Sequence, residues 1–464
     1  MPRVGLLVFS ETRAREDVYR LRKPIQDRET KRFISELSDE IEFAIPSCGE
    51  IRGKRDIRLA AREMEQAGVS SVILLVPIFV SPAMVAHASR LLGKPVAVVG
   101  NSSEDTFSQL TLIVGGAAVD QIGSVCRRIP GDVSDPVVKS ELLCFVRAAE
   151  TIRELRGSTF GCIGGRSLGI STGTADPAQW ERVFGVDTEH IDQLEVVLRA
   201  QQIEPDRVKL FFDWVHRNYG AVNYKERRLD SDRLEKQIRS YLAVLSIIEQ
   251  FELDFVGIKC QPELSNGYAL QCLAVQMLND PYDAEGPKDP IVCSCEADHD
   301  GALTMQILKL ISRGQPTALL DIFHVDDKKL IAGNCGAMAS YFAALSDDPK
   351  VNLCEVHLQP HGFGEAGGAA TQFVCAPDEF TFARLYRKAG AYEMAVFKGQ
   401  AVKEPREALK KYSWYRPTAF VEIDIDSKAF QREYGSNHVH CTRGDYTAEL
   451  AEFCELLNIP CRRY

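Results

Sequence analysis

Continuous apolar runs alternate with amphipathic segments over the first 150 residues. The runs at 4–9, 69–76, 96–99 and 110–114 are typical of buried strands, and residues 57–67 have helical spacing. Several runs end at Gly or Pro, as strands of parallel α/β sheets do at the edge where such sheets bind ligands. The glycines are equally consistent with simple turns between helices and strands. The pattern predicts an N-terminal α/β domain.

A long amphipathic segment, residues 137–156, ends at Gly157, which is a good helix stop. We therefore place a first domain at 1–156. Apolar runs that predict strands then recur at 159–163, 255–260, 291–294 and 318–323, and helical spacing recurs at 187–201, 233–251, 268–277 and 301–313. This alternation predicts a second α/β domain at 157–345, in which residues 318–323 form the last buried strand.

After residue 345 the pattern changes to short β-type segments separated by turns. They lie at 352–358, 370–376, 380–386, 393–398 and 418–425, and a final helix is expected at 446–457. Such a series favours an antiparallel sheet or small barrel. The predicted fold is thus two Rossmann-like α/β domains followed by a C-terminal antiparallel β-barrel-like domain at 346–464.

Composition narrows the class of protein. The chain has 464 residues and a formal net charge of −10, which argues against a general binder of nucleic acid or of an anionic membrane, since such a protein needs a basic face. No apolar run reaches the roughly 18–20 residues of a membrane span, and no Walker loop is present. The 14 cysteines are scattered without a CxxC pair, which we interpret as reduced thiols in a cytoplasmic protein. Metal ligation by Cys295 is a minor alternative.

Three polar clusters follow apolar runs and contain candidate metal ligands. Glu296 follows the run at 291–294, Asp321 stands inside the run at 318–323, and His438 lies in a turn-like cluster. An unpaired carboxylate inside an apolar run costs several kcal/mol, so a metal or a tight partner is expected beside Asp321. Alternatively, Glu296 is an acid at a helix N-terminus, Asp321 a helix cap and His438 an ordinary turn residue.

One strand–helix–strand step separates the two acids, and in a parallel sheet such a step brings both to one edge. Two carboxylates and an imidazole at roughly 2.0–2.3 Å suit a divalent ion such as Mn²⁺, with positions left for water and sugar oxygens. We therefore predict one metal site made of Glu296, Asp321 and His438.

The chain resembles the L-fucose isomerase family. Four segments are similar: 163–170 followed by 180–192, then 259–263 with Gln261, then 295–301 with 320–322, and finally 437–438 before the terminal helix. The resemblance implies a manganese-dependent aldose–ketose isomerase that works through a cis-enediol, with Glu296 and Asp321 as general acid and base. It also implies that Gln261 binds substrate, and that the protein is a homo-oligomer in which the first domain helps to recognise the sugar. L-Fucose, D-arabinose and a C6-modified hexose such as sulfoquinovose all remain candidate substrates.

Other residues are weaker candidates. His440 is a possible substrate contact or a partner of the metal ligands, and Arg166 with Ser167 could bind an anionic group. His357 and His361 flank a glycine-rich turn that either closes over the sugar or is a plain hairpin. A basic run after the first strand is either a solvated helix face or an anion clamp; it contains Arg13, Arg15, Arg20, Arg22 and Lys23.

Two other functions are compatible with the same residues. One is a metal-dependent lyase or aldolase that stabilises an enediolate on a ketose. The other is a sugar-binding homologue without turnover.

Overall fold

The computed structural model describes residues 1–11 and 16–464, and the chain divides into two compact units. The first unit contains residues 1–153 and 455–457, and the second contains residues 154–454 and 458–464. Arg13 and Arg15 of the predicted basic run lie outside the described residues. The division of the second unit at residue 345 stays a prediction.

The first unit is built on a parallel sheet with the strand order β2-β1-β3-β4-β5. Its strands are β1 (Arg3–Val8), β2 (Glu42–Ala44), β3 (Ser71–Leu75), β4 (Val96–Val99) and β5 (Arg127–Ile129). Its helices are α1 (Glu16–Leu37), α2 (Lys54–Gln66), α3 (Pro82–Leu92) and α4 (Ser108–Gln121), and α5 (Pro136–Leu155) continues into the second unit.

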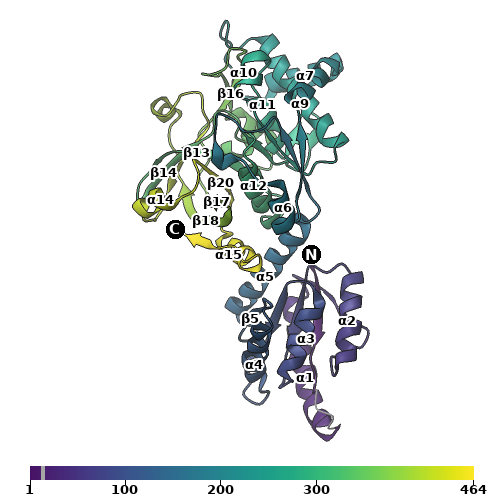
Figure 1. Ribbon diagram of the computed structural model, residues 1–464. Coiled ribbons are helices and arrows are strands. Elements are labelled where there is room, and N and C mark those ends of the chain that lie inside the picture. Colours follow the sequence, from purple (N-terminus) through teal and green to yellow (C-terminus); the bar gives the residue numbers. More distant parts are fainter. Residues whose placement is uncertain (12–15) are drawn as a thin grey trace. The chain divides into compact units, whose positions relative to one another are not determined.

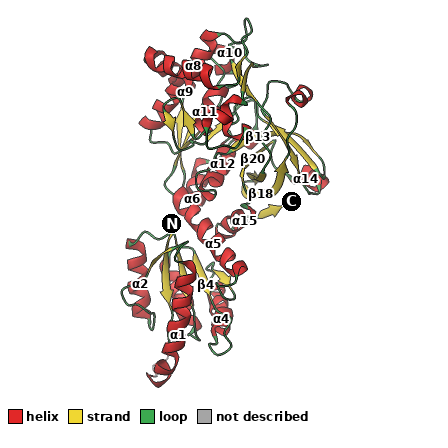
Figure 2. Ribbon diagram, turned by 180° about the vertical axis from the view of Figure 1, so that it is seen from behind, coloured by secondary structure: helices red, strands yellow, loops and turns green. Residues whose placement is uncertain are grey.

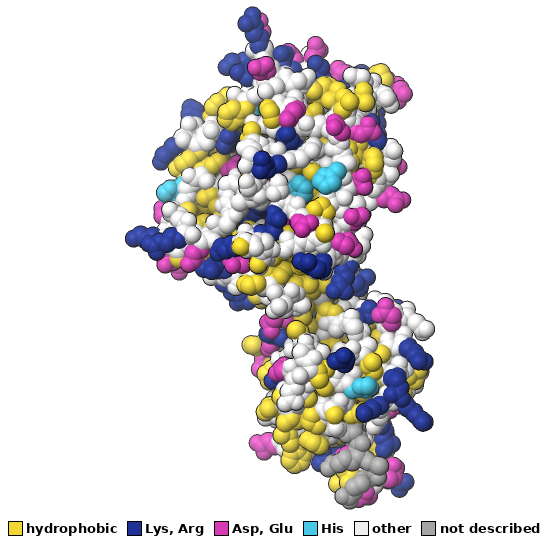
Figure 3. All heavy atoms as spheres, viewed as in Figure 1, with side chains coloured by type: hydrophobic (Ala, Val, Ile, Leu, Met, Phe, Trp, Pro, Cys, Tyr) yellow, Lys and Arg dark blue, Asp and Glu magenta, His cyan; other side chains and the backbone are white. Residues whose placement is uncertain are grey.

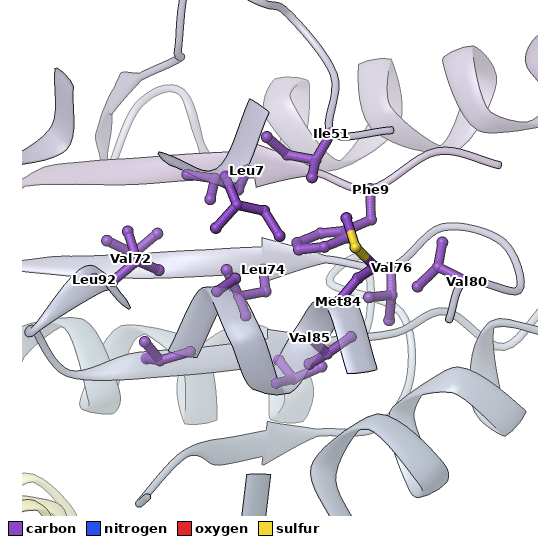
Figure 4. Close-up of a cluster of buried hydrophobic side chains, with 14 of the residues drawn as sticks. Leu7, Phe9, Ile51, Val72, Leu74, Val76, Val80, Met84, Val85 and Leu92 are labelled. Atoms are coloured by element: carbon purple, nitrogen blue, oxygen red, sulfur yellow. The ribbon is translucent and has the colours of Figure 1, made fainter. Parts of the chain in front are cut away.

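Apolar side chains on both faces of this sheet explain the continuous apolar runs. On one face Leu7 and Leu74 pack with Val85 of α3 (Figure 4), and on the other Leu6 and Ile73 form a second buried cluster. Burial on both faces is what a parallel sheet covered by helices requires.

The strand predicted at 110–114 is wrong, because these residues lie inside α4. A short apolar run does not distinguish a strand from a helix. Here Gly115 allows α4 to pack closely on Val85, while Leu110 and Ile113 remain 46% and 63% exposed. Hydrophobic side chains accordingly gather on the surface over α4 (Figure 3).

The second unit contains another parallel sheet, with the order β12-β9-β6-β7. Its strands are β6 (Thr159–Ile163), β7 (Asp187–Ile191), β9 (Phe255–Ile258) and β12 (Cys293–Cys295). Helices of this region are α6 (Pro177–Phe184), α7 (Gln193–Gln202), α8 (Pro205–Asn218), α9 (Ser231–Gln250), α10 (Glu263–Gly267), α11 (Cys272–Asn279) and α12 (His299–Ile311). Residues 187–201, predicted as one helix, are β7 followed by α7.

A seven-stranded sheet with the order β17-β20-β13-β14-β19-β18-β21 closes into a ring, because β17 also pairs with β18. Its strands are β13 (Ala318–Val325), β14 (Lys329–Gly333), β17 (Glu379–Lys388), β18 (Ala391–Ala401), β19 (Thr418–Glu422), β20 (His438–Arg443) and β21 (Cys461–Arg463). The predicted fold class, parallel α/β layers followed by a barrel-like sheet, is confirmed (Figures 1 and 2).

The remaining elements complete the second unit. The strands β15 (His357–Pro360), β16 (Ala369–Gln372) and β8 (Ala221–Val222) form a small sheet, and β10 (Tyr282–Asp283) pairs with β11 (Gly286–Pro287). The other helices are α13 (Pro349–Cys354), α14 (Ser427–Glu433) and α15 (Thr447–Leu456), with 3₁₀ turns at Ser171–Gly173, Ser340–Ala343 and Arg406–Lys411. The strand predicted at 352–358 begins instead within α13, which Asp348 caps.

The helix α12 joins the two main sheets of the second unit. It packs against β9 and β12 on one side and against β17 and β20 on the other, and nearly all of its residues are buried. The N-terminus of α12 therefore lies where the end of β12 meets the ring. None of the helices in the described residues combines the length and apolarity that a bilayer crossing requires.

We predict that Gly220→Ala destabilises the second unit by about 1–3 kcal/mol, as overpacking does. A Cβ on Gly220 would lie 2.1 Å from the carbonyl oxygen of Cys354, and backbone cannot yield as a flexible side chain can. Gly267→Ala is the matched control, because a Cβ there meets open space. Thermal unfolding of both variants measures the difference, and equal melting temperatures would contradict the packing described here.

Candidate metal centre

The end of β12 makes a tight turn that sets the position of Glu296. Glu296 and Ala297 have φ values of 62° and 50°, in the left-handed region that non-glycine residues seldom adopt. Backbone hydrogen bonds hold the turn: the Ala297 amide donates to the Ile258 carbonyl at 3.1 Å, and the Asp298 amide donates to the Cys295 carbonyl at 3.2 Å. Such conformations cost on the order of 1–3 kcal/mol each and are concentrated at functional sites.

Asp321 and His438 are cross-strand neighbours in the ring. β13 runs antiparallel to β20, and Asp321 lies directly opposite His438. The prediction that Asp321 reaches the site through a parallel strand beside β12 is therefore wrong, since β13 belongs to the antiparallel ring. An apolar run does not reveal which sheet its strand joins, and side chains on β13 become more exposed after Leu320.

The three predicted ligands nevertheless come together. The Nε2 atom of His438 lies 3.5 Å from Oε2 of Glu296 and 3.4 Å from Oδ1 of Asp321. His438 is almost fully buried, whereas the carboxylates retain side-chain exposures of 15% and 29%. One oxygen donor from each carboxylate thus lies near Nε2 of His438, although these three residues are not among the groups of described residues whose ligand atoms all lie within 4.8 Å of one another.

The Asp298 carboxylate fixes the orientation of His438. It accepts a hydrogen bond from Nδ1 of His438 at 2.7 Å, and it forms a two-bond contact with Arg384 at 2.5 and 3.1 Å. It also caps α12 by accepting from the Gly301 amide at 2.9 Å. A carboxylate behind the imidazole is the usual arrangement for a metal-binding histidine, because it fixes the ring and leaves Nε2 for the metal.

The charges at the site explain its pKa shifts. Burial alone would raise the pKa of Asp298, but the charges of Arg384 and His438 outweigh burial and hold this pKa well below its usual range. Burial raises the pKa of Glu296, although His438 opposes the shift. Burial alone would lower the pKa of His438, but Asp298, Asp321 and Glu296 together raise it well above its ordinary value. Three carboxylates surround one imidazole, so this place carries an excess of negative charge that a cation would compensate.

Two buried atoms at this place lack hydrogen-bond partners among the described residues. They are Nε2 of His438 and Oε2 of Glu296, which face each other. Leaving such groups unpaired costs about 1–3 kcal/mol or more each. A divalent cation would satisfy both atoms and compensate the excess of negative charge, so the residues present fit a metal ion.

The other predicted site residues lie in two places. Arg166 is exposed and follows β6, and Gln261 is half-buried and follows β9. Both strands belong to the same parallel sheet as β12, the strand that precedes Glu296. The Ser167 hydroxyl donates to the Gln261 carbonyl at 3.3 Å. His440 is completely buried and faces α12, where a Cβ on Gly301 would lie 2.7 Å from its Nε2. Their roles in binding stay predictions.

Sequence reasoning gave no role to Asp298, Arg384 or Arg416. Arg384 stands inside an apolar run, and a fully buried arginine implies a buried carboxylate partner, so a signal for this pair was present. Arg416 is half-buried, its guanidinium lies 5.5–5.8 Å from the rings of Phe323, Phe363 and Tyr415, and the Tyr415 hydroxyl and, to a lesser extent, the charge of Asp321 raise its pKa against burial. No local pattern indicates that position.

Comparison with known proteins identifies similar sequences. A family model described as "L-fucose isomerase, C-terminal domain" matches residues 332–463. A sulfoquinovose isomerase from Alkalicoccus urumqiensis is 23% identical over 336 residues, which cover 71% of this chain and 70% of the relative. An L-fucose isomerase from Citrobacter koseri is 24% identical over 451 residues, which cover 79% and 76%. The comparisons thus relate residues 332–463 to the C-terminal domain of L-fucose isomerases, and longer stretches of the chain to sugar isomerases.

Members of the L-fucose isomerase family are aldose–ketose isomerases, so the prediction of a sugar isomerase is confirmed at the level of the family. A second relative that is named sulfoquinovose isomerase, from Priestia aryabhattai, is also 23% identical and covers 72% of this chain and 70% of its own length. The identity of the substrate, the identity of the metal and the roles of individual residues stay predictions.

We predict that Arg384→Met destabilises the protein by about 3–5 kcal/mol, because it leaves the buried Asp298 carboxylate without its cationic partner. Lys328→Met, which removes an exposed ion pair with Asp424, is the control and should change the unfolding free energy little. Urea unfolding measures both. Similar stabilities for the two variants would show that the buried pair is dispensable.

The same pair predicts a pH dependence. Because the folded-state pKa of Asp298 lies below its unfolded value, its stabilisation is present above about pH 4 and is lost as the pH falls through the acid range. Asp298→Asn should therefore flatten the fall of unfolding free energy below about pH 4. If the unfolding free energies of the wild type and the variant fall equally steeply with decreasing pH, this assignment is contradicted.

Proposed function

We propose that the protein is a manganese-dependent aldose–ketose isomerase that acts on a monosaccharide. The observation that carries the proposal is the approach of both carboxylates to Nε2 of His438, at 3.5 Å for Glu296 and 3.4 Å for Asp321, with Nε2 and Oε2 of Glu296 left without hydrogen-bond partners among the described residues. The candidate substrates are L-fucose, D-arabinose and a C6-modified hexose such as sulfoquinovose. A homo-oligomer in the cytoplasm remains our expectation from the family resemblance.

Glu296, Asp321 and Nε2 of His438 would hold the ion. Two carboxylates and one imidazole are hard and borderline donors, a set that suits Mn²⁺ and offers no thiolate to favour a softer ion. When bound, a divalent cation supplies Lewis-acid polarisation of the sugar carbonyl and aligns two adjacent sugar oxygens. Asp298 and Arg384 would keep His438 in the orientation that this requires.

The two carboxylates would also move the protons of the reaction. One carboxylate removes the proton from C2 of the open-chain aldose, and the proton is returned at C1 of the ketose. The other carboxylate transfers the hydroxyl proton from O2 to O1, so the enediol passes to product without any external oxidant or reductant. Burial raises the pKa of Glu296, which brings it closer to the range in which a carboxyl group exchanges protons efficiently.

Substrate contacts would come from the edge of the parallel sheet and from the ring. Gln261 and Arg166 follow β9 and β6 and would hydrogen-bond to sugar hydroxyl groups, while we place His440 behind His438 as a buried support. Arg416, framed by aromatic rings near Asp321, would bind an anionic group at C6. A sulfonated aldose is therefore our first choice of substrate, which agrees with the names of several relatives.

We predict proton exchange with solvent during turnover. The protein is incubated with Mn²⁺ and a panel of sulfoquinovose, L-fucose and D-arabinose in deuterated water. Ketose formation together with deuterium at C2 of recovered aldose is the expected result, because a solvent-accessible carboxylate exchanges its proton. Carbon–carbon cleavage products would indicate a lyase, and unchanged sugars would indicate a binding protein; either result rejects the proposal.

We predict that Glu296→Gln and Asp321→Asn each lose Mn²⁺ and lower kcat at least about 100-fold, the scale of a general acid or base. Asp326→Asn is the matched control, because Asp326 is an exposed carboxylate further along the chain from β13. Elemental analysis after gel filtration measures metal content. Full metal retention in both site variants would mean that the ligands are assigned wrongly.

We predict that Arg416→Met raises KM for sulfoquinovose at least about tenfold and changes KM for a neutral aldose much less, since one charge-assisted hydrogen bond is worth about 1.5–3 kcal/mol. Arg432→Met, on α14, serves as the control. Equal losses on charged and neutral sugars would assign Arg416 a structural role instead.

A further inference from the structure

A second group of metal-ligating side chains is buried in the same unit. The ligand atoms of Cys272, Cys335 and His361 all lie within 4.8 Å of one another, and each residue is at most 8% exposed. The Sγ atom of Cys295 lies 3.3 Å from that of Cys335. These residues come from the start of α11, the loop after β14, the end of β15 and the end of β12, so the fold gathers them from distant parts of the sequence.

The backbone around Cys335 is held in place by several hydrogen bonds. The Asn334 side chain accepts from the amides of Gly336 and Ala337 at 3.0 and 2.7 Å and donates to the Leu319 carbonyl at 3.0 Å. The Thr371 hydroxyl donates to the Gly336 carbonyl at 2.9 Å. The Cys335 thiol is therefore presented by a loop that is already ordered, as a preformed metal site requires.

His361 is fixed with one donor and one acceptor nitrogen. Its Nε2 contacts the Cys335 carbonyl at 2.7 Å, and its Nδ1 accepts from the Phe363 amide at 2.9 Å. In this tautomer Nε2 carries the proton and the lone pair of Nδ1 accepts from the Phe363 amide, so metal binding at His361 would replace one of these two hydrogen bonds. The turn at His361 does not expose this imidazole to solvent, since the side chain is buried against Tyr415.

The environment favours a thiolate at this place. Hydrogen bonds from Cys272 and Cys295 outweigh burial and lower the pKa of Cys335. The same contacts with Cys335, together with burial, raise the pKa of Cys272 and of Cys295, so one thiolate is expected among the three thiols. A buried thiolate requires a compensating positive charge, as any buried ion does.

We propose that Cys272, Cys335 and His361 form a second metal site, which binds a thiophilic divalent ion such as Zn²⁺. A tetrahedral site with Zn–S near 2.3 Å and Zn–N near 2.0–2.1 Å places neighbouring ligand atoms roughly 3.5–3.8 Å apart, so small side-chain rotations suffice. The Cys295 thiol contacts Cys335 at 3.3 Å but lies outside the group of ligand atoms that are all within 4.8 Å of one another. Soft thiolates select Zn²⁺, whereas the carboxylates of Glu296 and Asp321 suit Mn²⁺, so the two sites differ in preference.

The test uses the full-length protein, stripped of metal and kept reduced, and titrated with Co²⁺ as a spectroscopic substitute for Zn²⁺. Thiolate-to-cobalt charge-transfer bands in the near ultraviolet and intense visible bands of tetrahedral cobalt are expected, and Zn²⁺ should abolish both. A site made only of carboxylates and imidazole gives no thiolate band, so Asp321→Asn should keep the signal. Absence of thiolate bands in the wild type overturns the proposal.

Variants assign the ligands. Cys335→Ser and His361→Asn should lose or strongly weaken the cobalt bands, whereas Cys354→Ser, which changes an exposed thiol, should retain them. If Cys335→Ser does not fold, as judged by circular dichroism, Cys272→Ser addresses the same question. Unchanged bands in a folded Cys335→Ser or Cys272→Ser variant would also overturn the proposal.

Discussion

The buried Asp298 carboxylate is the interaction on which the second unit depends. It caps α12, pairs with the fully buried Arg384 of β17 and holds Nδ1 of His438 on β20. One side chain thereby connects the helix that lies between the two main sheets with two strands of the ring. A buried charge is tolerated only when it is paired and hydrogen-bonded, so the loss of any one of these three contacts would destabilise the other two.

The geometry of the candidate metal centre follows from this constraint. With Nδ1 engaged, His438 presents Nε2 toward Asp321 across the strand pair and toward Glu296 at the end of β12. The left-handed turn at Glu296 and Ala297 brings the glutamate to the same point, at a conformational cost that the surrounding structure must offset. A parallel sheet supplies one ligand, and an antiparallel ring supplies two.

Much of this arrangement could be predicted from the sequence because its signals are local. Apolar runs located β6, β9 and β12, the helix stop at Gly157 marked the end of α5, and polar residues after apolar runs identified Glu296 and Asp321. The sheet that each strand joins could not be predicted from such local signals. Ala318–Val325 reads as another buried strand, yet it joins the ring, since pairing depends on contacts with β20 more than 100 residues later. The run at 110–114 failed for a related reason, because a short apolar run fits a helix equally well.

The supporting residues were harder to find than the ligands. Asp298 lies in the same segment as Glu296, but its role depends on Arg384 and His438, which are remote in sequence. The grouping of Cys272, Cys335 and His361 is equally invisible along the chain, since no CxxC spacing marks it. Charge pairing and metal ligation in this protein are properties of the folded state.

The most direct test of the central claim is anomalous diffraction from crystals soaked in Mn²⁺. The predicted result is a strong peak about 2.0–2.3 Å from Nε2 of His438 and from carboxylate oxygens of Glu296 and Asp321, with the Asp298–His438 hydrogen bond intact. Absence of a peak at this place would contradict the account.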